Sequence, residues 1–287
     1  MPTPPLLESG YRHLKRIGAK DLKGEEVAST LQAMATEGWS QLWTKCLLIE
    51  QTSLVPGKSY VAFSLGEKVS RPVNSVLFVR DPAALQLAEQ FIRSPLTLNA
   101  AEATRAVYTI ALSVIAANDV FEVGRKASAT FYEILIGHMV AAAIGMNPTK
   151  RVRMPENPNV ALPTDYVFDL GSGQPKIHLP VKTSTRERIV QAWVHQLVLE
   201  RIFGANVFRG LLVVIGETKR NTKTNAVIEI CTPKQLQLIQ ARIAKMDRVY
   251  YLDPPAPYLA LRTAVPARIE VRPFGEFFSE VKTLTAF

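Results

Sequence analysis

Two extended runs joined by a glycine-containing turn constrain the fold of this chain more than any other feature of its sequence. Residues 165–170 and 176–182 are rich in β-prone residues and flank Gly171-Ser172-Gly173. Glycines between two extended runs are typical of a hairpin turn. The pattern therefore predicts two antiparallel strands that lie side by side.

The residues after the hairpin predict how it extends into a larger sheet. A helix is predicted over 185–203, followed by Gly204, the residue type favoured just after a helix. The next run, 207–215, is almost continuously apolar, as in a strand that is buried on both faces. Strand, strand, helix and buried strand in this order predict a mixed α/β (α+β) core flanked by helices.

The N-terminal half is expected to be mainly helical, and we divide the chain into a helical region, 1–120, and the α/β core, 121–287. The first 25 residues are polar and Pro-rich and predict a loose arm, while 147–161 holds prolines and asparagines and predicts a loop. Apolar spacing and helix-start signals predict the helices at 25–48, 81–92, 100–117 and 128–146.

Composition favours a polyanionic partner inside the cell. The chain has 34 Lys+Arg against 25 Asp+Glu, a net charge of +9, which favours nucleic acid first and an anionic membrane surface second. The apolar stretch at Ala106–Ala117 is shorter than the roughly 20 residues that span a bilayer, so no membrane association is expected. Cys46 and Cys231 form no CxxC pair or zinc pattern, which favours a cytoplasmic setting.

The hairpin brings together two residues with complementary chemistry. Asp165 begins the first strand and Lys182 ends the second. Residues equidistant from the turn pair across a hairpin, so Asp165 faces roughly positions 179–182 and becomes a neighbour of Lys182. Glu133, on the helix predicted over 128–146, is a candidate second acid. Carboxylates hold Mg²⁺, which acidifies a bound water, and an ammonium orients that water or stabilises developing charge. This set predicts metal-dependent hydrolysis of a phosphodiester.

Residues 124–215 resemble the PD-(D/E)xK nuclease superfamily, and within it the type II restriction endonucleases. Pro163-Thr164-Asp165 resembles the P-D motif that opens one strand, and Lys182 matches the lysine that closes its partner. Lys182, Ser184 and Arg186 are similar to the K-x-S-x-x-R pattern of members whose second acid has moved to the following helix. The resemblance implies a Mg²⁺-dependent site in which Asp165 binds metal, Lys182 positions water and Glu133 supports the site.

The sequence departs from that pattern in three places. One residue is inserted in the P-D motif, Arg186 comes one position early, and the position two before Lys182 is Pro180, which cannot ligate a metal. At the place of the migrated acid the chain has His195 and Gln196, and Glu200 follows one helical turn later. Gln196 and Glu200 are therefore the candidates for the second metal ligand, and the choice between them stays open.

Basic and polar residues surround the same hairpin in the sequence. Such side chains make salt-sensitive contacts to phosphates and can read base edges in a groove. The candidates for DNA binding are Arg151, Arg153, Ser184, Arg186, Arg188, Lys219, Arg220 and Lys223.

The resemblance implies a homodimer that cuts both strands of double-stranded DNA at a specific site. The N-terminal helical region is expected to provide dimer contacts and further DNA recognition. Phosphate-loop motifs such as GxxxxGK[ST] and GxGxxG are missing from the sequence, so no nucleotide cofactor is expected. Two alternatives stay open: a DNA-binding protein without catalysis, and a nuclease of the same fold that acts on branched or nicked DNA in repair or recombination.

Overall fold

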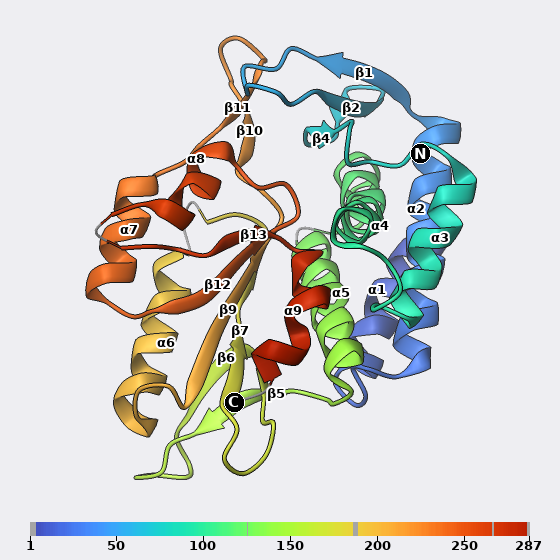
Figure 1. Ribbon diagram of the computed structural model, residues 1–287. Helices are drawn as coiled ribbons and strands as arrows, with labels where there is room; N and C mark the ends of the chain where they lie inside the picture. The colour runs from blue at the N-terminus through green and yellow to red at the C-terminus, as the bar shows by residue number, and fades with distance from the viewer. Residues whose placement is uncertain (1–3, 125, 186–188, 266, 286–287) are drawn as a thin grey trace. The chain divides into compact units, whose positions relative to one another are not determined.

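The computed structural model describes residues 4–124, 126–185, 189–265 and 267–285, apart from the side chains of 5 and 189. The chain forms two compact units (Figure 1). The first contains Met1–Ala143 together with Thr218–Ile230, and the second contains Ile144–Glu217 together with Cys231–Phe287. The division near residue 120 expected from the sequence therefore falls about one helix earlier than the division between the compact units.

Helices make up most of the first unit. Asp81 caps α3 by accepting from the Ala83 N–H, and Asn99 begins α4 in a capping box with Glu102. The helices of this unit are α1 (Pro5–Gly18), α2 (Glu25–Lys45), α3 (Pro82–Arg93), α4 (Ala100–Phe121) and α5 (Ala127–Ile144). The four helices predicted from the sequence are confirmed with shifted ends.

The prediction of a loose N-terminal arm is wrong, because α1 is a packed helix. Leu7, Leu14 and Ile17 recur at helical spacing and are all buried. Proline stands in the first turn, where its missing N–H costs nothing. The Pro-rich start of the sequence therefore marks a helix N-terminus, with its polar residues on the exposed face.

Helices α4 and α5 are long and apolar enough to cross a membrane by length and composition alone. In the folded chain, 78% of the most apolar window of α4 and 67% of that of α5 are buried. Apolar residues around the whole circumference are typical of helices at the centre of a folded core. The two helices serve as that core in the first unit.

A small antiparallel sheet and a hairpin complete the first unit. The sheet has the order β1-β2-β3, with β4 also paired to β2, and β10 pairs with β11. Ser53 forms an isolated bridge with Val227 of the hairpin. The strands are β1 (Leu47–Gln51), β2 (Tyr60–Leu65), β3 (Lys68–Val69), β4 (Val73–Asn74), β10 (Thr218–Arg220) and β11 (Val227–Glu229).

The second unit is built on a seven-stranded mixed sheet of order β13-β12-β9-β7-β6-β5, with β8 paired to β9. The β6–β7 pair is antiparallel, as predicted for the hairpin, whereas β7, β8 and β12 run parallel to β9. The strands are β5 (Thr149–Arg153), β6 (Ala161–Phe168), β7 (Lys176–Leu179), β8 (Val181–Lys182), β9 (Phe208–Val214), β12 (Met246–Tyr251) and β13 (Val271–Pro273).

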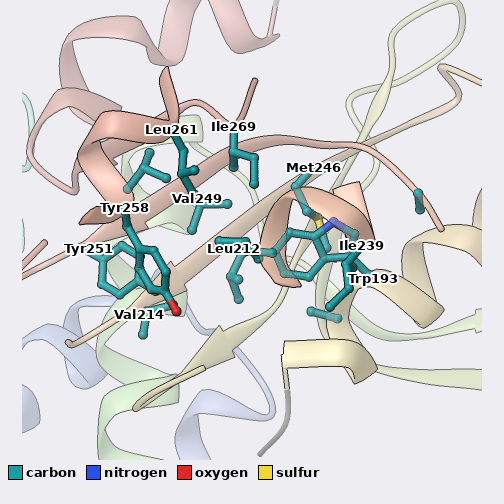
Figure 2. Packing of buried hydrophobic residues seen from close by; sticks show 14 residues of the cluster. Trp193, Leu212, Val214, Ile239, Met246, Val249, Tyr251, Tyr258, Leu261 and Ile269 are labelled. Carbon is teal, nitrogen blue, oxygen red and sulfur yellow. The ribbon is translucent and has the colours of Figure 1, made fainter. Parts of the chain in front are cut away.

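Helices cover both faces of this sheet (Figure 1). On one face lie α6 (Ile189–Phe203) and α7 (Pro233–Arg242), and Figure 2 shows Trp193 and Ile239 of these helices packed beside Leu212 and Val249 of the strands. On the other face lies α9 (Glu276–Thr285), whose Glu280 bonds Arg248 and Tyr250 of β12. The buried strand predicted over 207–215 is confirmed as β9.

Three local predictions for the second unit are wrong. The loop expected over 147–161 contains β5, because its exposed basic residues pair with β6 at the sheet edge. The apolar sequence of residues 258–262 favours a short strand, but these residues form α8 (Ala256–Leu259) and the 3₁₀ helix η1 (Ala260–Thr263) after Pro255. The helix α9 was not predicted, and it is amphipathic, with Phe277 and Phe278 buried.

Candidate functional site

The predicted juxtaposition of Asp165 and Lys182 is confirmed. The β6–β7 register pairs Tyr166 with Leu179, so Asp165 lies one position further, opposite Pro180. Its Oδ2 accepts from the Lys182 Nζ at 2.6 Å and from the Val181 backbone N–H at 2.8 Å. The carboxylate therefore ties the open end of the hairpin to the start of β8.

Pro180 interrupts the strand without shifting its register. On the β9 side, His178 pairs with Gly210, and Val181 pairs with Val213, so the offset between the strands is unchanged. The Pro180 carbonyl still accepts from the Val213 N–H at 3.0 Å. Proline removes only its own donor, and the Lys182 strand continues on the line of β7.

The Asp165–Lys182 pair is largely enclosed. The Asp165 side chain is 23% exposed and that of Lys182 is 17% exposed. Partial burial strengthens the electrostatic interaction of the pair with each other and with a ligand, because less water screens the charges. The pair stays accessible from solvent, as a substrate site requires.

A hydrogen-bonded chain that includes the buried side chains of Gln196 and His178 lies beside this pair. Gln196 on α6 donates from Nε2 to Glu200 Oε1 at 2.9 Å and to the Phe208 carbonyl at 3.0 Å. Because both of these partners only accept, the amide oxygen must face His178 Nδ1, 3.0 Å away. Nδ1 of His178 therefore carries the proton and donates.

His178 is neutral and presents a lone pair on Nε2. Burial is the main cause that lowers the pKa of His178 to about 4, and the charges of His195 and Lys182 act in the same direction. The hydrogen bond that His178 donates to Gln196 and the Asp165 charge act in the opposite direction. Nε2 is buried and has no hydrogen-bond partner within the described part of the chain. The ring of His195 lies 6.3 Å away, and burial and Lys182 lower its pKa as well.

A hard divalent cation fits the Asp165 end of this cluster better than the Gln196 end. Both hydrogen bonds described for Asp165 use Oδ2, and Oδ1 is the oxygen that a cation would take. The Gln196 oxygen is engaged by His178, and the Glu200 Oε1 by Gln196. Among the described residues, three or more His, Cys, Asp or Glu side chains nowhere gather closely enough to form a complete metal site.

The other acid expected at the site belongs to the first unit. Glu133 lies on α5 and is partly buried between Tyr132 and Ile134, which are buried. The cluster above is built from second-unit residues alone. The role of Glu133 as a supporting acid stays a prediction.

The predicted DNA-binding residues fall in different parts of the chain. Arg151 and Arg153 lie on the exposed strand β5, and neighbouring Lys150 packs over the Tyr166 ring at 4.7 Å. Ser184 lies in the partly buried loop after β8. Arg186 and Arg188, in the first turn of the helix predicted over 185–203, lie outside the residues that the structure describes.

The remaining basic candidates belong to the β10–β11 hairpin of the first unit. Lys219 and Lys223 are exposed. Arg220 instead donates from Nε to Gln51 Oε1 at 3.0 Å and from Nη2 to the Ser70 carbonyl at 2.8 Å. Its guanidinium holds the hairpin against the small sheet, a structural role that its sequence neighbourhood did not indicate.

The sequence reasoning missed the buried partners of the site. His178 lies two residues before Pro180, a spacing that puts it on the Lys182 side of the strand. Glu217, in the polar segment after the strand predicted over 207–215, is wholly buried. An acid that directly follows a buried strand was the available signal.

The fold and the placement of the hairpin pair define a restriction-endonuclease-like architecture: a mixed sheet with an acid–lysine hairpin, flanked by helices. The structure matches the crystal structure of the type IIP restriction endonuclease Kpn2I with a TM-score of 0.83 at 22% identity, covering 98% of this chain and 99% of that one. The chain thus shares the fold of that enzyme over nearly its whole length.

A second structure, the restriction endonuclease PspGI in complex with substrate DNA, gives a TM-score of 0.43 at 12% identity, covering 99% of this chain and 93% of that one. That score is too low to establish a shared fold. No protein-family model matches the sequence, and no curated protein matches it.

Proposed function

We propose that this chain is a Mg²⁺-dependent, site-specific endonuclease that hydrolyses phosphodiester bonds in double-stranded DNA. The observation that carries the proposal is the enclosed Asp165–Lys182 pair at the open end of the β6–β7 hairpin. The fold shared with the type IIP restriction endonuclease Kpn2I supports the same function. The excess of basic residues supports a nucleic-acid substrate.

The two residues of the pair have separate roles in this proposal. Asp165 would hold the cation, while its Oδ2 keeps Lys182 in place. When bound, the cation supplies Lewis-acid stabilisation of the phosphate and lowers the pKa of a water. The Lys182 ammonium orients the attacking water and stabilises negative charge as it develops on the phosphate.

The second metal ligand in the proposal comes from α6. Gln196 supplies an amide oxygen if it exchanges its bond with His178 for one to the cation, and Glu200 supplies a carboxylate next to it. Pro180, opposite Asp165, contributes no side-chain ligand. Glu133 is proposed as a further supporting acid.

The exposed edge strand β5 is the proposed DNA contact of the second unit. Arg151 pairs in register with Pro163, two residues before Asp165, so its strand runs beside the one that carries the carboxylate. Arg151 and Arg153 are exposed and suited to phosphates. In the first unit, Lys219 and Lys223 on the β10–β11 hairpin are proposed to contact DNA, and two copies of the chain are proposed to cut the two strands.

The test is digestion of a long, sequence-diverse DNA by the full chain with Mg²⁺, with EDTA, and with the variants Asp165→Ala and Asp169→Ala. Asp169 is the matched control, because it forms its own ion pair with Lys176 on the same hairpin at 2.5 Å. The proposal expects discrete bands that require Mg²⁺ and Asp165 but not Asp169.

Other outcomes separate the alternatives. Intact DNA in every lane, with a folded protein that still retards DNA in a gel, indicates a binding protein in which Pro180 marks a lost site. A smear that depends on nicks or branches in the DNA indicates a structure-specific nuclease. Equal loss of cleavage in both Asp variants contradicts the assignment of the site to Asp165.

A further inference from the structure

Glu217 is a wholly buried carboxylate that the proposed chemistry does not use. Its exposed fraction is 0%. Three donors converge on its Oε1: the Thr185 backbone N–H at 2.9 Å, the Thr185 hydroxyl at 2.6 Å and the Tyr251 hydroxyl at 2.9 Å. Burying a carboxylate is costly unless such bonds compensate, so its place needs an explanation.

The position of Glu217 follows from the register of three parallel strands. Lys182 of β8 pairs with Val214 of β9, and Val214 pairs on its other side with Tyr251 of β12. Thr185 lies three residues after Lys182, and Glu217 lies three residues after Val214. The Thr185 backbone N–H donates to the Glu217 carboxylate, which joins the two segments again. The side chain thus prolongs the connection between strands past the last backbone pair.

This contact fixes the segment that leaves Lys182. Only Thr183 and Ser184 separate Lys182 from Thr185, which is itself 3% exposed. Glu217 holds both the backbone and the side chain of Thr185, so this residue has little freedom to move. On its other side Lys182 follows Val181, whose N–H is held by Asp165. The lysine therefore lies between two anchored residues.

The bonds of the Glu217 carboxylate indicate a role in positioning Lys182 as well as in stability. Two of the three donors come from one residue of the Lys182 segment, and the third, Tyr251, comes from a neighbouring strand. Bonds to a charged acceptor are stronger than bonds between neutral groups. A carboxylate at this place holds Thr185 more firmly than an amide or an apolar side chain of the same size.

We propose that Glu217 is a positioning residue that sets the place of the Lys182 ammonium by anchoring Thr185. The inference rests on the proposed nuclease function for its kinetic consequence, but the placement of Lys182 is measurable without cleavage. Tyr251 has the role of completing the hydrogen bonds of the carboxylate from the opposite side.

The experiment compares Glu217→Gln, Thr185→Val and Thr185→Ser in the full chain, with Tyr251→Phe as the matched control. Each variant is measured for single-turnover DNA cleavage, DNA affinity, melting temperature, and the rate at which Lys182 is reductively methylated, read by mass spectrometry. Thr185→Ser keeps the hydroxyl that bonds Glu217, and Thr185→Val removes it at similar volume.

Glu217→Gln and Thr185→Val are expected to slow cleavage about 10- to 100-fold at unchanged DNA affinity. Losses of this size are typical of residues that orient a directly acting side chain without touching the substrate. Faster methylation of Lys182 is also expected, since a lysine that is held less firmly by Asp165 is more accessible. Thr185→Ser is expected to keep the cleavage rate and the Lys182 methylation rate near those of wild type. Tyr251→Phe is expected to lower the melting temperature and to leave both rates near wild type.

The outcomes separate the two proposals. If wild type cuts no DNA but Lys182 methylation still rises in Glu217→Gln and Thr185→Val, the positioning role stands and the nuclease proposal fails. If wild type cuts DNA and Thr185→Val matches it in cleavage and methylation, the positioning role is contradicted. If Glu217→Gln fails to fold, the comparison of Thr185→Val with Thr185→Ser decides, because Thr185→Val removes one of the three bonds and Thr185→Ser keeps all of them.

Discussion

The β6–β7 hairpin carries an aspartate–lysine pair at each end, and the two pairs have very different surroundings. At the turn, Asp169 and Lys176 are 2.5 Å apart with side chains 55% and 35% exposed. At the open end, Asp165 and Lys182 are 2.6 Å apart but only 23% and 17% exposed. The chemistry of the residues is the same, and what differs is the structure around them.

The turn pair satisfies its charges locally. Lys176 holds the pKa of Asp169 below its ordinary value, helped by the Gly171 N–H. The open-end pair is joined to a backbone N–H of β8 and lies near the buried His178 and Gln196. A carboxylate beside an ammonium is thus a candidate site only where strand ends and a neighbouring helix surround the pair and partly bury it.

The largest expected difference between the two ends is kinetic. Lys182→Met is expected to slow single-turnover cleavage about a hundredfold to a thousandfold, because it removes a donor aimed at developing charge. Lys176→Met is expected to leave the rate within about twofold, because an exposed pair contributes little. Quenched-flow cleavage of one DNA substrate measures both, and comparable losses in the two variants contradict the comparison.

The second difference is in pH dependence. The folded pKa of His178 is about 4 against an ordinary 6.5, so between these values the unfolded chain binds more protons than the folded one. The contribution of His178 to the free energy of unfolding is therefore fully present above pH 6.5. It is lost as the pH falls towards 4, and the loss amounts to at most about 3 kcal/mol. His178→Asn is expected to flatten that part of the curve in urea unfolding at several pH values.

The turn pair loses its contribution in a lower pH range. The pKa of Asp169 lies below its ordinary 3.8, so the stability it provides is present above 3.8 and is lost only as pH falls through the lowered value. The free energies of unfolding of Asp169→Asn and wild type are expected to differ by a constant amount between pH 6.5 and 4. A difference that changes with pH in this range would be inconsistent with the assignment.

The third difference is the coupling energy within each pair. A double-mutant cycle of Asp165→Ala and Lys182→Met is expected to give about 1–3 kcal/mol, because each single change leaves an enclosed polar group without its partner. The cycle of Asp169→Ala and Lys176→Met is expected to give less than about 1 kcal/mol, and to shrink with added salt. Chemical unfolding at two salt concentrations measures both, and equal couplings would refute the role given to burial.

The smallest expected effect is at the turn itself. Gly173 has φ +80°, a conformation that side chains disfavour. Gly173→Ala is expected to cost about 1 kcal/mol of stability and to leave cleavage unchanged. A calorimetric melt with a parallel cleavage assay checks both. A loss of cleavage here would mean that the turn end takes part in function.

The hairpin was predictable from the sequence because its signals are local. Gly171-Ser172-Gly173 and the runs on both sides set the turn, and the turn sets which residues meet at the open end. The helices α3 and α4 were predictable for the same reason, since Asp81 and Asn99 cap them.

The rest of the site depends on pairings between distant residues, which no local pattern encodes. Glu217 meets Thr185 only because β8 and β9 pair in parallel, across 32 residues. His178 bonds Gln196 because α6 packs back over β7. The strand β5 was missed because its polar sequence is compatible with a sheet edge only when β6 is beside it.

The most direct test of the central claim is the ratio of the single-turnover cleavage rates of Asp165→Asn and Asp169→Asn on the same DNA, with Mg²⁺ and saturating protein. We expect a rate for Asp165→Asn at least about a hundredfold below that for Asp169→Asn, with both variants folded and bound to DNA. A ratio near one would contradict the claim that the enclosed end of the hairpin carries the chemistry.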